Sequence, residues 1–313
     1  MSFDRETLER TIASHGRVAR IVVLDSAGSV PRGAGTAMLV WDRGQDGTIG
    51  GGTLEFGAVK AARSALETGR ERHDRLPLGP ALGQCCGGLV RLLTEIWDTE
   101  RLHVAGNPVV RPLPGTTGAE PLAMARARGD LRAGKRTGLC VAEGWVLEPV
   151  CQPDIPLWIY GAGHVGRAIV HTLHPLPQFA ITWVDTGIER FPEVVPRQVE
   201  ILPAANPADA VALAPANAQH LVLTYSHALD LEICHRLLGH GFAGAGLIGS
   251  ATKWARFRKR LAQLGHRPDQ IDRITCPIGE PALGKHPQAI AVGVVSRLVS
   301  RQVPRQFEKA ARA

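Results

Sequence analysis

A glycine-rich stretch near the middle of the chain has the spacing of a dinucleotide-binding turn. Gly161, Gly163 and Gly166 form a G-x-G-x-x-G pattern after an apolar run and before apolar residues at helical spacing, with His164 inside the turn. A strand, a glycine turn and a helix in this order let backbone N–H groups approach an anion. Asp185 ends a second apolar run 24 residues after Gly161, near the distance at which an acid contacts a ribose hydroxyl. The pattern predicts a Rossmann-type unit, with NAD(P) as one candidate ligand.

A second glycine-rich segment stands at the predicted start of a helix in the first half of the chain. Gly50, Gly51 and Gly52 directly precede an apolar stripe at helical spacing that ends at Gly69. Consecutive glycines at a helix start let several N–H groups point at one oxyanion, which suits phosphate. Tight packing beneath the helix is the alternative explanation. Glu55, in the first helical turn, is expected to cap the helix rather than to catalyse a reaction.

Two adjacent thiols and an amide form a third candidate site, because Gln84, Cys85 and Cys86 have glycines on both sides. Neighbouring cysteines rarely form a disulfide with each other, since the small ring strains the peptide bond between them. A glycine-flanked loop with two thiols suits a soft metal or a sulfur-bearing group. The alternative is that Cys85 and Cys86 are small buried apolar side chains.

Three further residues lie in loops that could contact a ligand. Arg32 stands in a glycine-rich connection between predicted strands at 18–24 and 37–41, which forms either a loop over a ligand or a plain hairpin. Ser250 follows a predicted strand, and Cys276 begins a Cys-Pro-x-Gly loop. Ligands of open α/β sheets bind at the carboxyl ends of the strands, where such loops lie. A buried structural thiol is the alternative for Cys276.

The spacing of apolar residues predicts an N-terminal α+β domain at 1–105, a linker at 106–154 and a Rossmann-like domain at 155–313. In the last part, strands alternate with helices, one of them at 208–214, which predicts a mainly parallel sheet. The linker is expected to hold a helix and a β-hairpin after a proline-rich surface loop at 104–117.

The composition is that of an ordinary globular chain with a basic balance. A net charge of +7 and a pI of about 9.4 favour an anionic ligand or an acidic partner surface. The cations are scattered and aromatic residues are few, so no nucleic-acid partner is expected. No apolar run approaches the ~20 residues of a membrane helix, and the N-terminus lacks the layout of a signal peptide. The six cysteines include no C-x-x-C pair and no zinc-ligand spacing. Because no export signal is present, we expect reduced thiols in a cytoplasmic protein, and no membrane partner is expected.

In this order, the motifs resemble those of the xanthine dehydrogenase accessory protein family, often written XdhC/CoxI. The resemblance spans nearly the whole chain, and the combination is more specific than any single motif. The matching segments are Gly28-Ser-Val-Pro-Arg-Gly33, Gly50-Gly-Gly-Thr-Leu-Glu55, Leu82-Gly-Gln-Cys-Cys-Gly-Gly88, Tyr160-Gly-Ala-Gly-His-Val-Gly166, Leu247-Ile-Gly-Ser-Ala-Thr-Lys253, Cys276-Pro-Ile-Gly279 and Pro287-Gln-Ala-Ile-Ala-Val292.

The resemblance implies an accessory protein rather than a turnover enzyme. Members of this family bind the molybdenum cofactor, protect its sulfurated form and deliver it to xanthine dehydrogenase or a related molybdoenzyme, with a cysteine desulfurase as the sulfur source. We expect Gln84, Cys85 and Cys86 to face the molybdenum, and either glycine turn to hold the pterin phosphate. An NAD(P)-dependent oxidoreductase based on Gly161 and Asp185 is the alternative, and a homodimer is left open.

Overall fold

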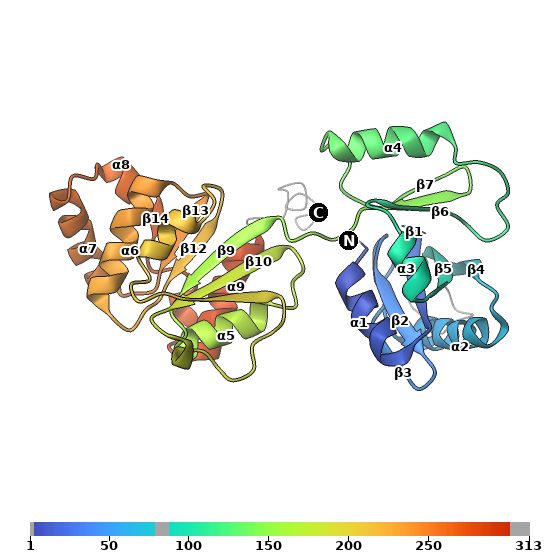
Figure 1. Cartoon of the computed structure of the whole chain (residues 1–313), viewed down its shortest axis with the longest axis horizontal. Helices are drawn as coiled ribbons and strands as arrows, with labels where there is room; N and C mark the ends of the chain where they lie inside the picture. Colours follow the sequence, from blue (N-terminus) through green and yellow to red (C-terminus); the bar gives the residue numbers. More distant parts are fainter. Residues whose placement is uncertain (1–2, 79–87, 301–313) are drawn as a thin grey trace. The chain divides into compact units, whose positions relative to one another are not determined.

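The computed structural model describes residues 3–78 and 88–300, and the chain divides into two compact units, Met1–Cys151 and Gln152–Ala313. Both units combine helices with strands, so the predicted mixed α/β class is confirmed (Figure 1). Across these described residues, no helix is both long enough and apolar enough to cross a bilayer.

The first unit is built on a five-stranded antiparallel sheet with the order β3-β2-β1-β5-β4. Its central strands are long and apolar, whereas the two edge strands are short or polar. The strands are β1 Val18–Ala27, β2 Ala37–Trp41, β3 Gly44–Gly47, β4 Arg72–Pro77 and β5 Leu89–Trp97.

Helix α2, Gly52–Thr68, covers one face of this sheet (Figure 1). Its apolar stripe, which includes Leu54, Ala58 and Ala62, packs on strand residues that alternate along β1, β2 and β5. The helix ends at Gly69, whose left-handed φ of 71° matches the conformation that a C-terminal cap requires. The predicted helix after the triple glycine is therefore present.

The opposite face of the sheet is covered by helices and by a second, three-stranded sheet of order β6-β8-β7. Val22 and Leu93, for example, pack against Leu113 and Val146 across the two sheets. The elements on this face are α1 Arg5–His15, α3 Thr99–Val104, β6 Val109–Pro112, β7 Cys140–Ala142 and β8 Trp145–Glu148. Helix α4, Leu122–Arg132, packs on the three-stranded sheet through Met124 and Ala127, which contact Leu147 of β8. The surface loop predicted at 104–117 is therefore wrong for residues 109–112, which form β6 and pair with β8.

Four buried charges join the two sheets of this unit. Glu148 accepts two hydrogen bonds from Arg20, of 2.9 and 2.7 Å, and also pairs with Arg111. Arg111 pairs in addition with Glu95, which lies opposite Arg20 on β5. Buried charges are tolerated where they neutralise one another and share hydrogen bonds, so this cluster fixes how the two sheets stack.

The second unit is a parallel six-stranded sheet with the order β11-β10-β9-β12-β13-β14, which is the 3-2-1-4-5-6 order of the dinucleotide-binding fold. The predicted Rossmann-like domain is confirmed. Its strands are β9 Ile155–Tyr160, β10 Phe179–Asp185, β11 Val199–Pro203, β12 Gln219–Val222, β13 Gly244–Leu247 and β14 Ile274–Thr275.

Helices cover both faces of this sheet, because alternate strand residues on each side are apolar. Leu157 and Ile159 face α5 His164–Leu173 and α9 Pro287–Ser300, which pack together (Figure 1). Trp158 and Tyr160 face the other layer. That layer holds α6 His227–His240, α7 Ala251–Gln263, α8 Pro268–Ile271 and the short 3₁₀ turn η3 Asp209–Leu213, where the sequence predicts a helix at 208–214. The remaining turns are η2 Ile188–Arg190 and η4 Pro281–Leu283.

Candidate functional site

The turn between β9 and α5 contains three glycines, two of which are required by packing. Gly161 has a φ of +122°, and a Cβ atom there would lie 2.5 Å from the carbonyl oxygen of Leu223. A Cβ atom on Gly166 would lie 2.0 Å from the carbonyl oxygen of Gly161. Glycine is needed at these two positions to close the turn and to let α5 approach the sheet.

Gly163 is different, because neither its backbone nor its neighbours demand glycine. Its φ is −72°, and a Cβ atom added there would meet nothing within 4 Å. Gly163 is the N-terminal cap of α5, and no side chain caps this helix. The second glycine of such a turn is where the backbone admits a phosphate group, so Gly163 has the geometry of an anion-binding position.

Asp185 holds this turn in place from the end of β10. Its carboxylate is 4% exposed, and it accepts hydrogen bonds from the backbone N–H of Ala162 and of Thr186, both at 2.6 Å. Arg190 lies 3.5 Å from the same carboxylate. The sequence predicts that Asp185 contacts a ligand, but in this geometry a ribose hydroxyl would compete with two backbone donors. Asp185 therefore positions the glycine turn.

An exposed aromatic ring lies at the same edge of the sheet. Tyr225 follows β12 and is 70% exposed, with the Arg190 guanidinium 5.2 Å from its ring centre. Arg190 thus bridges Asp185 and Tyr225. A cation stacked on an exposed aromatic ring holds that ring in place, and a held ring offers a face to a planar ligand.

A buried ion pair lies after β12 and β13, and sequence reasoning missed both of its members as site residues. Lys253 of α7 donates to the Asp230 carboxylate at 2.6 Å and to the carbonyl of Ile248 at 3.0 Å. Asp230 of α6 also accepts from the backbone N–H and the hydroxyl of Thr224. The pair therefore fastens the loop after β12 to the loop after β13. A Cβ atom on Gly249 would lie 2.7 Å from the aliphatic stem of Lys253, so glycine leaves the space that this side chain fills.

Ser250 and Cys276, both predicted from the sequence, lie beside this pair. The Ser250 hydroxyl accepts the backbone N–H of Lys253 and caps α7, which is a structural role. The Cys276 sulfur lies 3.9 Å from the carbonyl of Gly249. Burial raises the pKa of the Cys276 thiol to about 11, which outweighs the opposite effect of Lys253. Cys276 is consequently a neutral thiol at pH 7 and a weaker nucleophile than an ordinary exposed cysteine.

The triple-glycine turn in the first unit is already occupied by a carboxylate of the chain itself. Glu55 accepts hydrogen bonds from the backbone N–H of Ile49 at 3.2 Å and of Gly51 at 3.0 Å, and from the Thr48 hydroxyl at 2.6 Å. Burial opposes the charge of Glu55, but these hydrogen bonds lower its pKa. The expectation that Glu55 caps the helix agrees with this geometry, and a phosphate would have to displace it.

Packing joins the glycine-rich segments of the first unit. A Cβ atom on Gly50 would lie 2.4 Å from Pro31 and 3.8 Å from Arg32, and one on Gly88 would lie 2.4 Å from the carbonyl of Ser29. The Arg32 side chain is exposed. Loops at 28–33, 50–52 and 88 thus meet at one end of the sheet. Gln84, Cys85 and Cys86 lie outside the described residues.

The sequence-predicted site residues therefore lie in two groups, one in each unit. Gly161, Gly163, His164, Gly166, Asp185, Ser250 and Cys276 are at or next to the carboxyl edge of the parallel sheet, whereas Arg32, Gly50, Gly51 and Gly52 are at one end of the antiparallel sheet. Asp230, Lys253 and Tyr225 join the first group. Lys253 ends one of the family motifs, which is the one sequence signal for it, whereas Asp230 and Tyr225 are indicated only by their position after neighbouring strands.

A parallel sheet of this order with a glycine turn at its carboxyl edge defines a Rossmann-type binding domain joined to a separate α+β unit. Comparison with protein families gives the same division. The model described as "XdhC Rossmann domain" matches residues 157–298, and the "XdhC and CoxI family" model matches residues 11–77. The chain belongs to the XdhC/CoxI family.

Two relatives extend the comparison over both units. The chain is 24% identical over 282 residues to "Uncharacterized protein YqeB" of Escherichia coli strain K12, a match that covers 88% of this chain and 42% of that protein. The chain thus spans less than half the length of this relative. A crystal structure described as a xanthine dehydrogenase from Bacillus halodurans matches with a TM-score of 0.70 and 20% identity, covering 97% of this chain and 98% of that one. At this identity the likeness establishes a shared fold.

Proposed function

We propose that this protein carries the molybdenum cofactor, protects its sulfurated form and delivers it to xanthine dehydrogenase or a related molybdenum hydroxylase. Membership of the XdhC/CoxI family supports an accessory role. The observation that carries the binding part of the proposal is Gly163, a glycine that neither packing nor backbone conformation requires. A phosphate approaching the uncapped start of α5 would explain it.

The cofactor presents three chemical features, and the residues at the carboxyl edge suit two of them. Its phosphate oxygens would accept hydrogen bonds from the backbone N–H groups of Gly163 and of the first turn of α5. Its flat pterin ring would lie on the exposed ring of Tyr225, which Arg190 holds. The turn at 50–52 suits the phosphate less well, because the charged Glu55 carboxylate accepts the N–H of Gly51 and the Thr48 hydroxyl accepts the N–H of Gly50.

The third feature is the molybdenum with its sulfur ligands. Cys85 and Cys86 are the proposed contacts, because thiols suit a soft metal and both stand in a family motif. Cys276 suits this role less well, since burial raises the pKa of its thiol to about 11 and so disfavours the thiolate that binds a metal. A carrier must release its cargo, so weak or transient contacts serve it better than a complete ligand set. A cysteine desulfurase would supply the sulfur before delivery.

The strand order favours one second candidate, an NAD(P)-dependent oxidoreductase. Asp185 suits it less well, because its carboxylate already accepts three hydrogen bonds, from the N–H of Ala162 and from the N–H and hydroxyl of Thr186, and has little capacity left for a ribose hydroxyl. Titration of the purified protein with NAD(H) and with molybdopterin separates the two functions. Tight NAD(H) binding without pterin affinity would favour the oxidoreductase.

The direct test is to purify the full chain from cells that make the cofactor and to measure bound molybdenum and pterin. We expect both in the wild-type protein. The double variant C85A/C86A should keep the pterin and lose most of the molybdenum, while C140A, a thiol outside the family motifs, should keep both. A wild-type protein that retains neither would contradict the proposal, and unchanged metal in C85A/C86A would remove these thiols from the site.

A further inference from the structure

A surface pocket of about 430 Å³ lies between one face of α5 and the start of α9, and none of its lining residues belongs to the loops after β12 and β13. It is lined by His164, Arg167, Ala168, His171, His286, Pro287 and Gln288. His164, Arg167 and His171 stand at i, i+3 and i+7, which places them on one face of α5. His286 comes from the segment just before α9, so two separate parts of the chain bring three imidazoles and a guanidinium to one pocket.

Two of these groups are fixed in orientation. Arg167 donates its Nε to the carbonyl of Ala162 and one terminal nitrogen to the carbonyl of Arg190, both at 2.9 Å. His286 accepts the backbone N–H of Gln288 at its Nδ1, at 3.3 Å, so a neutral ring carries its proton on Nε2. The pocket therefore holds donors whose positions are set before any ligand binds, which lowers the entropic cost of binding.

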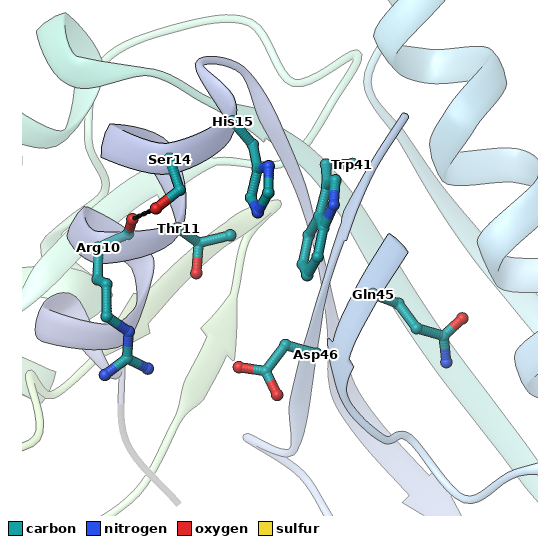
Figure 2. Close-up of a pocket in the computed structure, with 7 residues that line it drawn as sticks. All are labelled: Arg10, Thr11, Ser14, His15, Trp41, Gln45 and Asp46. Carbon is teal, nitrogen blue, oxygen red and sulfur yellow. Dashed lines mark hydrogen bonds between the residues drawn. The ribbon is translucent and has the colours of Figure 1, made fainter. Parts of the chain in front are cut away.

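The charge of the lining distinguishes this pocket from a second surface pocket among the described residues. That pocket, of about 350 Å³ in the first unit, contains both Arg10 of α1 and Asp46 of β3, together with His15 stacked on Trp41 (Figure 2). No carboxylate is among the residues that line the α5–α9 pocket. Its cationic and donor groups are therefore not neutralised locally, which favours an anion.

A structural role or a metal site explains the histidines less well. Within residues 3–78 and 88–300, the side chains of His164 and His171 make no hydrogen bond or ion pair, although His171 lies beside His174 with ring centres 5.8 Å apart. Residues 164 and 171 are also two helical turns apart, too far for joint metal ligation. Within the described part of the chain, no three His, Cys, Asp or Glu side chains are arranged to hold a metal ion.

We propose that the α5–α9 pocket binds the phosphate group of a small phosphate monoester. Arg167 and the Nε2–H of His286 donate to the phosphate oxygens, His164 and His171 add further donors, and Ala168 and Pro287 contact the organic part. The inference goes beyond the carrier function. The pocket shares only His164 with the residues proposed to bind the cofactor. The proposal therefore does not depend on which cargo the glycine turn binds.

The test follows the imidazole C–H resonances of the cofactor-free full chain by NMR during titration with inorganic phosphate and with phenyl phosphate. We expect saturable shifts of His164, His171 and His286, with the ester binding more tightly because of the apolar walls. His235 on α6 should not respond to either. Saturation by inorganic phosphate alone would identify free phosphate as the ligand and overturn the ester.

A charge variant gives the decisive comparison. Q288E places a carboxylate in the pocket at the second position of α9, where an acid favours the helix, so the fold should be retained. It should weaken phenyl phosphate binding roughly tenfold or more. Q263E makes the same change on the exposed surface of α7 and should leave the affinity unchanged. Equal affinity in both variants, no saturable shift in the wild type, or saturation of the three histidines by Zn²⁺ but not by phosphate would overturn the proposal.

Discussion

At the scale of single residues, the three glycines of the turn after β9 have different reasons to be glycine, and a pair of substitutions can separate them. G166A should destabilise the fold by about 1–3 kcal/mol or more, because the added methyl would lie 2.0 Å from the carbonyl oxygen of Gly161. G163A fills open space at the start of α5 and should cost less than about 1 kcal/mol. Urea denaturation of the two variants measures the difference. Equal losses would show that Gly163 is also a packing residue.

The buried cluster around Glu148 predicts a pH-dependent contribution to stability. Burial alone would raise the pKa of Glu148, but the attraction of Arg20 and Arg111 outweighs burial and lowers it to about 2, from 4.5. A lowered pKa means that the stabilisation is present above pH 4.5 and is lost as the pH falls towards 2. E148Q should therefore cost about 3 kcal/mol at pH 7 and progressively less below pH 4.5.

Urea denaturation of wild type and E148Q at pH 7 and pH 3.5, about one unit below the ordinary glutamate value, checks this expectation. E200Q, at an exposed position of β11, is the matched control and should show no such trend. A free-energy difference between wild type and E148Q that does not change with pH would contradict the assigned pKa.

At the scale of elements, the start of α2 predicts where phosphate does not bind. Glu55 accepts the N–H groups of Ile49 and Gly51, and its lowered pKa keeps it charged at pH 7. Wild type should show no saturable shift of the Gly51 amide in an NMR titration with inorganic phosphate, whereas E55Q, which removes the charge, should show one. A saturable Gly51 shift in the wild type would restore this turn as a phosphate site.

The elements that the sequence predicts are those with a buried apolar pattern. Strand β9 is identified by an apolar run because both of its faces are buried, and helix α5 by apolar residues at helical spacing because one of its faces packs on the sheet. Strands β3 and β4 lie at the edges of their sheet and consist of Gly-Gln-Asp-Gly and Arg-His-Asp-Arg-Leu-Pro, which have no apolar alternation. Residues 109–112, which form β6, are predicted as loop because Arg111 and the prolines in and around the strand resemble a surface segment, although Arg111 is buried with its ion-pair partners.

The candidate site was predictable only where its residues are close in sequence. The glycine turn is one continuous motif, so its position at the carboxyl edge follows from the strand–turn–helix pattern. Asp230 and Lys253 are 23 residues apart and acquire a joint role only when β12 and β13 are adjacent. Glu55 competes with an external anion for the same N–H groups only because its side chain points back towards them. The spacing of apolar residues does not predict that direction.

At the scale of the whole molecule, the two units are expected to fold independently. The first unit has two sheets and the second has one, each unit has its own buried cores, and the division falls between Cys151 and Gln152. Residues 1–151 and residues 152–313, expressed separately, should each give a cooperative thermal transition by circular dichroism. A fragment 152–313 that lacks such a transition while the full chain has one would show that the Rossmann-type unit depends on the first.

The central claim is that the glycine turn after β9 receives the phosphate of the molybdenum cofactor, and equilibrium binding to one variant tests it most directly. Molybdenum cofactor affinity should be measured by fluorescence for wild type, G163A and the control G129A, an open position on α4. We predict that G163A binds roughly tenfold more weakly or worse, about 1.4 kcal/mol, while G129A binds like the wild type. Equal affinity of G163A and wild type would contradict the account.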